Sequence, residues 1–239
     1  MLRLSTLSSV SAAALVALAT LSAAAPARAA LVTDPAVTIA PSQDAFVYED
    51  LPTTVMQQSF GGAYNGILAV ANTDLSGHDL FAYVGFNLTG VTLNTDDRVT
   101  LHLYVDDGTT IGFPFQNPSA AAPALVTASA ATSAWNESVT YATIPTVAST
   151  PAASVSVNGV NQWISLDITD LAKDWISGAQ TNYGLVLQMP NPDAGGLVAV
   201  VTDSSAGPNP AYLQIGAVPE PASLGLLGAG MLLLIRRKK

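Results

Sequence analysis

The sequence predicts an all-β protein: a single antiparallel β-sandwich, jelly-roll-like, with one short helix. Short runs of β-branched and aromatic residues alternate with Gly, Pro, Asn, Asp and Ser along the central part of the chain, which is typical of strands and turns. The run Val99–Val105 alternates apolar and polar residues, the period expected of a half-buried strand. About ten such strands in one domain of this size indicate two packed sheets.

The strands are expected to follow one another with short connections. Their predicted ranges are 37–39, 44–48, 66–71, 81–88, 99–105, 125–128, 138–142, 163–168, 185–189, 197–202 and 212–215. Small and polar residues dominate 117–133 and 146–154, so these segments should contribute mainly loops or edges. One helix is predicted over 170–178, with Asp170 as N-cap and Gly178 after the last turn.

The C-terminal residues 218–239 have a different pattern. Pro219-Glu220-Pro221 resists helix formation, and an apolar run from Ala222 to Ile235 and a basic end, Arg236-Arg237-Lys238-Lys239, follow it. About 14 apolar residues are fewer than the roughly 17–25 of a comfortable membrane span, but long cationic side chains extend such a span. We therefore expect a C-terminal hydrophobic helix that inserts transiently into the membrane, with its basic end in the cytoplasm.

This tail resembles the PEP-CTERM sorting signal. The resemblance rests on Pro219, Glu220, Pro221 and the basic residues Arg236 and Arg237, with the apolar run between them. It implies that an exosortase-type membrane protease recognises the signal, removes the helix and passes the protein outward. It also implies a membrane-anchored precursor, followed by a cell-surface or extracellular product, in bacteria that make exopolysaccharide and biofilm.

The N-terminal residues 1–29 are predicted to be a secretory signal peptide, in helical form. Arg3 precedes an apolar stretch from Val10 to Leu21, and Ala27 and Ala29 fit the small-x-small cleavage rule. The chain then divides into a signal peptide (1–29), a β-sandwich (30–217) and a sorting signal (218–239).

Charge and cysteine content exclude several functions. Residues 30–217 keep two basic residues, Arg98 and Lys173, against 16 acidic ones, a formal charge of −14. Such a surface repels phosphate, so no nucleic acid is expected as a partner. The chain has no cysteine, which removes disulfides, thiolate catalysis and cysteine metal sites.

The central segment also resembles DNRLRE-type β-sandwich domains. The matching segments, in order, are 44–47, 135–141, 163–169, 175–178 and 182–187. The resemblance implies an extracellular bacterial module, of a kind often joined to polysaccharide enzymes and sometimes carbohydrate-binding. The chain departs from that pattern at three places. The basic residue expected before the third strand is missing from 80–84, and Asn87 replaces an Asp. Asp203-Ser204-Ser205 stands where the motif that gives DNRLRE domains their name would lie.

Two kinds of binding residue are predicted. Calcium, the one cofactor considered, would use Asp44, Glu49 and Asp50 at one end or Asp106 and Asp107 in a turn, although a solvated acidic surface is the alternative. Glycan contacts are assigned to exposed aromatic and amide side chains, namely Tyr48, Tyr64, Asn65 and Tyr83. Trp163 and Trp175 are interpreted as core residues.

Catalysis has little support in the sequence. The chain has two histidines, His78 and His102, and no G-x-S-x-G elbow. The prediction is therefore a non-catalytic protein, not an enzyme, at the bacterial cell surface or in the exopolysaccharide matrix, with a structural or matrix-associated role. A carbohydrate-binding module that recognises extracellular polysaccharide is the alternative, and a polysaccharide hydrolase or lyase comes third.

Overall fold

The structure is a computed structural model that describes residues 36–72, 78–107, 116–190 and 198–217. The predicted signal peptide, the sorting motif and the C-terminal hydrophobic helix lie outside these ranges. Within them, the one α-helix is too short and too polar to span a bilayer.

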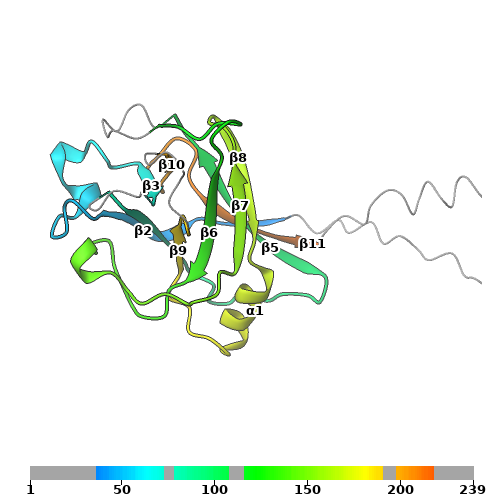
Figure 1. The fold of residues 1–239 in the computed structure, drawn as a ribbon. Coiled ribbons are helices and arrows are strands. Elements are labelled where there is room, and N and C mark those ends of the chain that lie inside the picture. Colours follow the sequence, from blue (N-terminus) through cyan, green and yellow to red (C-terminus); the bar gives the residue numbers. More distant parts are fainter. Residues whose placement is uncertain (1–35, 73–77, 108–115, 191–197, 218–239) are drawn as a thin grey trace, which may run out of the picture. The chain divides into compact units, whose positions relative to one another are not determined.

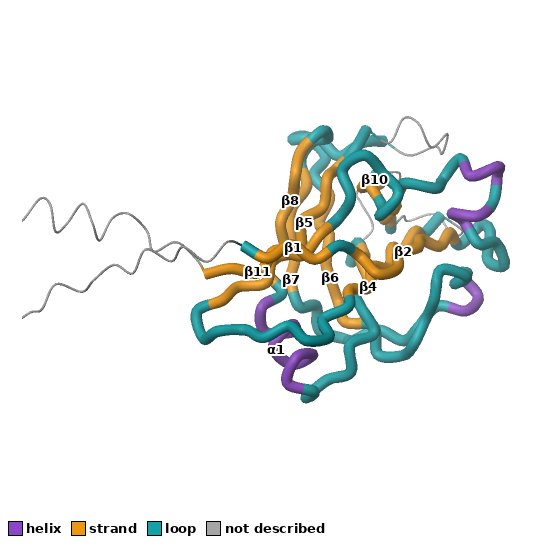
Figure 2. The backbone as a smooth tube through the Cα atoms, turned by 180° about the vertical axis from the view of Figure 1, so that it is seen from behind, coloured by secondary structure: helices purple, strands orange, loops and turns teal. Residues whose placement is uncertain are grey.

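The described residues form an antiparallel, sandwich-like β-structure with one α-helix, which confirms the predicted fold class (Figure 1). The strands are β1 (Val37–Ile39), β2 (Pro41–Tyr48), β3 (Ile67–Ala71), β4 (Leu80–Phe86), β5 (Asp97–Val105), β6 (Ala124–Ala130), β7 (Ala153–Val157), β8 (Gln162–Asp167), β9 (Leu185–Gln188), β10 (Ala199–Asp203) and β11 (Tyr212–Ala217). The helix α1 (Thr169–Ser177) follows β8 and lies at one end of the domain (Figure 2).

Hydrogen-bonded neighbours follow the order β1-β11-β5-β10-β3-β4-β9-β6-β7. Two further strands join from the side, β2 on β4 and β8 on β5. Strand β5 is the longest and pairs with β8 and with β11 over most of its length. These three strands, far apart in the sequence, therefore share one continuous outer surface.

Apolar side chains pack in two clusters. The larger lies between the layers and includes the fully buried Phe46, Leu101, Leu166 and Leu213. The smaller lies on the outer surface of β2, β4 and β9, where residues such as Val47, Tyr83 and Val186 are buried. Because β2 and β4 are covered on both sides, they are buried at consecutive positions instead of alternate ones.

Two local predictions were wrong, one on a strand and one on a helix cap. Residues 138–142 form no strand, because the Asn136 side chain accepts a hydrogen bond from the Ser138 N–H (2.8 Å) and a 3₁₀ turn follows at Tyr141–Thr143. Strand β7 overlaps the segment 146–154, which was predicted as loop or edge, and it is an edge strand at the end of the strand order. Asp170 is in the first turn of α1 and not at its N-cap, whereas Gly178 ends the helix as expected, with φ of 77°.

Candidate functional site

The outward-facing side chains of β5, β8 and β11 form one surface, which we call the open face. Side chains alternate between buried and accessible along β5 and β8, as in a half-buried sheet. The open face consists of Arg98, Thr100, His102, Tyr104, Trp163, Ser165, Asp167, Tyr212 and Gln214.

Strand register brings four rings of this surface into contact. Tyr104 lies opposite Trp163, and His102 lies opposite Tyr212. The Trp163 ring is edge-on to Tyr104 and to Tyr212, with centroid separations of 5.4 and 5.3 Å. The His102 ring stacks on Tyr212 at 4.7 Å. The result is a continuous aromatic cluster from three strands, with separations typical of favourable ring contacts.

Trp163 is the most accessible part of this cluster, and its prediction as a core residue is wrong. Its side chain is 44% exposed, whereas its neighbours Ile164 and Leu166 are buried. Trp163 has the same parity as Ser165 and Asp167, so it points outward with them. Trp175 is buried on α1, as expected.

Polar groups surround the rings. The Nδ1 atom of His102 lies 2.9 Å from the Ser165 hydroxyl, across the β5–β8 pair. Burial lowers the pKa of His102, and a hydrogen bond with Gln214 opposes this effect. His102 is therefore neutral at physiological pH, and the aromatic cluster carries no charge.

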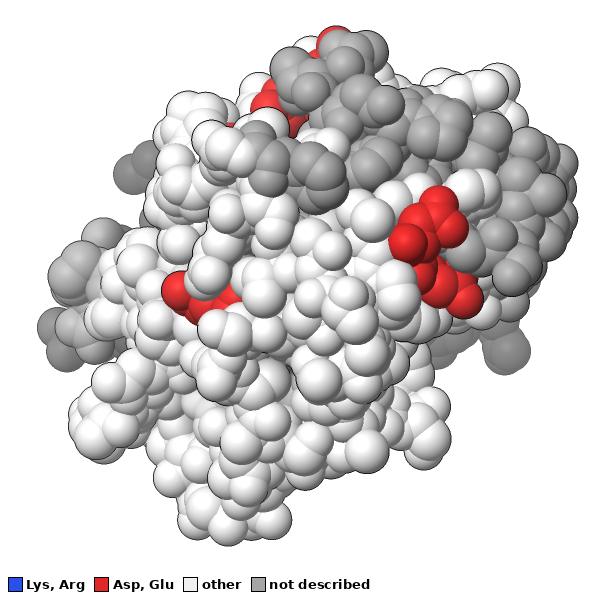
Figure 3. All heavy atoms as spheres, turned by 90° about the vertical axis from the view of Figure 1, so that its left-hand side faces the viewer, with Lys and Arg blue, Asp and Glu red and all other residues white. Residues whose placement is uncertain are grey.

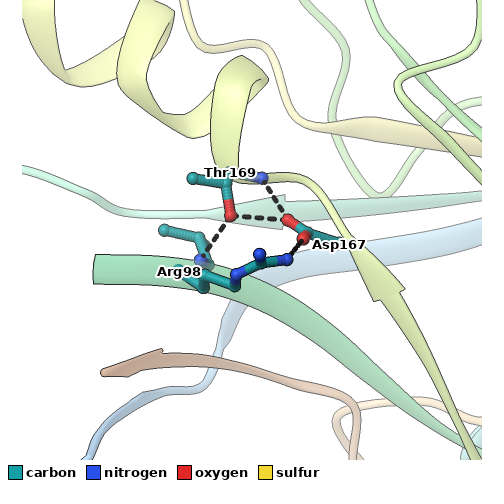
Figure 4. Close-up of polar contacts among 4 residues, drawn as sticks. Arg98, Asp167 and Thr169 are labelled. Atoms are coloured by element: carbon teal, nitrogen blue, oxygen red, sulfur yellow. Dashed lines mark hydrogen bonds and ion pairs between the residues drawn. The ribbon is translucent and has the colours of Figure 1, made fainter. Parts of the chain in front are cut away.

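An ion pair lies farther along the same face (Figure 4). The Arg98 guanidinium donates to Asp167 Oδ2 at 2.7 Å. Hydrogen bonds from Thr169 and the contact with Arg98 together lower the pKa of the Asp167 carboxyl, although burial opposes them. Asp167 is therefore ionised at neutral pH, and the pair has no net charge.

The residues predicted to bind glycan lie elsewhere, and two of them are not exposed. Tyr83 is fully buried, and Tyr48 is 5% exposed with its hydroxyl donating to Asp50 Oδ2 at 2.7 Å. Tyr64 is half-buried against Phe46, and Asn65 is exposed. The expectation that Tyr48 and Tyr83 are exposed is wrong, because both lie on strands covered by other parts of the chain.

Calcium was predicted at one of two alternative sets, Asp44 with Glu49 and Asp50, or Asp106 with Asp107, and neither belongs to a larger acidic group among the described residues. The described residues contain no group of three or more His, Asp or Glu side chains that could hold a metal ion. Figure 3 shows acidic side chains in separate patches on one side of the domain.

Several of these carboxylates are engaged within the protein. Asp44 is buried and accepts from Gln57 Nε2 at 2.8 Å and from the Ser205 N–H at 2.7 Å. Asp50 Oδ2 lies 2.8 Å from His78 Nδ1, and the Glu49 carboxylate accepts from the Asp79 N–H at 3.4 Å. In the turn after β5, the Asp106 side chain accepts from the Asp107 N–H, and the Asp107 side chain accepts from Asn117 Nδ2. Calcium binding stays a prediction that this geometry does not favour.

A cavity of about 380 Å³ lies beside α1, apart from the open face. Its lining includes Leu88, Val91, Trp175 and Asn182. The Asn182 amide already bonds Phe86 O at 2.9 Å and the Gly184 N–H at 3.0 Å. The Asn182 side chain is therefore engaged in joining two parts of the backbone.

Comparison with protein families assigns both parts of the chain. The model of carbohydrate-binding module family 96 matches residues 35–216. The chain is a member of this family. A PEP-CTERM protein-sorting motif matches residues 217–239, directly after the family-96 module. No curated protein matches the chain.

The two matches decide several predictions. The PEP-CTERM resemblance is confirmed, and with it an exported protein whose membrane-anchored precursor is processed to the cell surface. The family-96 match supports carbohydrate binding, which was the alternative to a structural role. The DNRLRE resemblance is not confirmed by either match and stays a prediction.

Sequence reasoning missed Tyr104, Tyr212 and His102 as site residues. The available signal was strand parity: Tyr104 alternates with the apolar Leu103 and Val105, and Tyr212 with Leu213. No sequence signal showed that β5, β8 and β11 are neighbours.

Proposed function

We propose that the family-96 module binds a polysaccharide of the cell surface or matrix through the open face and does not cleave it. The observation that carries this proposal is the exposed Trp163 ring in contact with Tyr104 and Tyr212. In a solvated sheet face, a large aromatic side chain that is nearly half exposed is a candidate for recognition.

The chemistry of the face suits a sugar chain. Aromatic rings offer apolar surface for the C–H groups of a pyranose, and Ser165 and Gln214 offer hydrogen-bonding groups for hydroxyls. A sheet face is open along the strands, so an extended chain can cross it without an enclosed pocket. The acidic module, with a formal charge of −14 over residues 30–217, favours neutral glycans over polyanions.

Two observations support a binding role without cleavage. Hydrolysis of glycosides generally uses two carboxyl groups that flank the bond, and the open face as defined contains one, Asp167. Elsewhere, Tyr48, Asp50 and His78 form a polar cluster. Burial and Asp50 raise the pKa of Tyr48, so its hydroxyl stays protonated at neutral pH and does not act as a general base.

The decisive experiment measures polysaccharide binding of the exported protein by affinity gel electrophoresis, with neutral and acidic polysaccharides. Trp163→Ala should weaken binding at least about thirtyfold, the loss expected for a central anchor residue. Leu125→Ala is the matched control, because Leu125 is 43% exposed on β6, outside the open face. It should bind like the wild type.

Two results would contradict the proposal. If the wild-type protein retains no affinity for any polysaccharide, the structural matrix role predicted first becomes the better explanation. Release of reducing or unsaturated ends from a bound polysaccharide would show that the protein is an enzyme.

A further inference from the structure

The polar cluster of Tyr48, Asp50 and His78, which we call the triad, lies outside the open face and brings three possible metal ligands together. The Tyr48 hydroxyl oxygen lies 2.7 Å from Asp50 Oδ2 and 3.2 Å from His78 Nδ1. The Asp50 and His78 atoms lie 2.8 Å from each other. A phenol, a carboxylate and an imidazole therefore converge, although their residues come from two different parts of the chain.

The edges of this triangle match one face of an octahedral metal centre. With bonds of about 2.0–2.1 Å at right angles, neighbouring donor atoms around a metal ion are about 2.9 Å apart. A facial set of three nitrogen and oxygen donors, with open positions on the other side, is an arrangement that binds non-haem iron. Calcium fits less well, because it takes about 6–8 oxygen ligands at about 2.3–2.6 Å.

The backbone holds the triad in place. Tyr48 ends β2 and pairs with Leu80 at the start of β4, and directly beyond this pair the Glu49 N–H donates to Asp79 O at 3.0 Å. The rings of Tyr48 and His78 stack with a centroid separation of 6.4 Å. The strand pairing thus fixes the phenol beside the imidazole, and the donor atoms need little rearrangement to bind an ion.

The triad is accessible from one side and lies in acidic surroundings. The Tyr48 side chain is buried, whereas the Asp50 and His78 side chains are 40% and 29% exposed. An ion can therefore reach the triad past Asp50 and His78 and keep positions open to solvent. Glu49 and Asp79 add negative charge beside it, and the sequence from 36 to 80 has no Lys or Arg. The local potential thus favours a cation.

We infer that Tyr48, Asp50 and His78 bind one ferric ion. Phenolate and carboxylate are anionic oxygen donors that suit trivalent iron, and both imidazole and tyrosine are iron ligands in proteins. Bonds form from iron to the Tyr48 oxygen, Asp50 Oδ2 and His78 Nδ1, and the phenol proton that the ion replaces passes to solvent. No electron is transferred, so the iron stays ferric. This inference does not depend on glycan binding.

The test equilibrates the exported protein with ferric nitrilotriacetate, removes unbound iron by gel filtration, and measures retained iron by mass spectrometry and the visible absorption spectrum. The wild type should retain a single iron ion and show a phenolate-to-iron charge-transfer band. Tyr48→Phe should abolish this band. Asp50→Asn and His78→Gln should each weaken iron binding at least about tenfold, since even the outer-shell partners of metal ligands contribute about 10–100-fold.

Tyr183→Phe and Asp96→Asn are the matched controls, because they remove a phenol hydroxyl and a carboxylate outside the triad. Asp96 is exposed in the turn before β5. Both controls should bind iron and absorb like the wild type, and so should Trp163→Ala, which alters only the open face. Thermal melts verify that every variant is folded, and iron should raise the melting temperature of the wild type and the controls because it binds the native state.

Three results would overturn the inference. If the wild type retains no iron, the triad is a hydrogen-bonded cluster and nothing more. A charge-transfer band that persists in Tyr48→Phe, or equal iron binding by wild type and His78→Gln, would place the iron elsewhere. Polysaccharide binding is measured separately, so the failure of this inference and the failure of the proposed function are distinguishable.

Discussion

Two outer surfaces of the domain carry aromatic clusters, and they differ in what covers them. On the open face, Trp163 contacts Tyr104 and Tyr212 in an accessible cluster. The second surface is the outer side of β2, β4 and β9, which we call the covered face. There the ring of Tyr83 packs against the ring of Trp135, with a centroid separation of 5.5 Å, and Val139 and Val186 belong to the same buried cluster. The same residue types therefore stabilise the fold on one surface and remain available for recognition on the other.

The largest expected difference is in stability after truncation of one ring on each face. Tyr83→Ala should lower the free energy of unfolding by about 3–5 kcal/mol, because it removes a fully buried aromatic side chain. Trp163→Ala should change it by less than about 1 kcal/mol, since its ring is nearly half exposed. Urea denaturation measures both values, and similar losses in the two variants would contradict the distinction.

A smaller loss of stability is expected at Trp135, which lies in the segment between β6 and β7 that covers Tyr83. Trp135 Nε1 donates to Tyr183 O at 2.6 Å, which links the segment to the residues before β9. Trp135→Phe should cost about 1–2 kcal/mol, through the lost hydrogen bond and the carbonyl left without this donor. Trp163→Phe is the control on the open face and should unfold at the wild-type urea concentration; a destabilised control would show that Trp163 also supports the fold.

Removal of one oxygen from the covered face should be almost neutral. The Tyr83 hydroxyl is buried and has no hydrogen-bond partner among the described residues. Tyr83→Phe should therefore leave stability unchanged or raise it by up to about 1 kcal/mol. The same urea series measures this, and a clear loss of stability would mean that the hydroxyl is hydrogen-bonded.

The smallest expected effects are in the pH dependence of folding stability. The open face should lose stability in acid, and the covered face should lose it in alkali. Burial lowers the pKa of His102, so folding opposes its protonation, and stability should decline as the pH falls below about 6.5. Burial raises the pKa of Tyr83, so stability should decline as the pH rises above about 10. Comparing urea midpoints with those of His102→Gln and Tyr83→Phe isolates each group; unchanged pH profiles in these variants would exclude the two residues as the cause.

The fold class could be predicted because its signals are local. The alternation in Val99–Val105 predicted an inner face of Val99, Leu101, Leu103 and Val105, and all four residues are buried. Turn residues between β-branched runs marked most strands in the same way. The strand prediction for 138–142 failed because the hydrogen bond that the Asn136 side chain accepts and those within the 3₁₀ turn outweighed the β-propensity of the segment.

The candidate site was less predictable because it depends on distant segments. The parity of Trp163 with Ser165 and Asp167 was available in the sequence and favoured an exposed ring. The pairing of β5 with both β8 and β11, which joins the rings, was not. Nor did the sequence show that a later segment covers Tyr83, so a strand tyrosine on the outer side was mistaken for an exposed one.

Strand β11 has a mechanical consequence. It holds Tyr212 at its beginning and leads directly into the sorting motif after Ala217. While the precursor is anchored, tension between a bound glycan and the membrane would pass along this strand. Six residue pairs with β5 and three with β1 hold β11 in the sheet. A pull directed along the axis of β11 would load these pairs together in shear, rather than one after another.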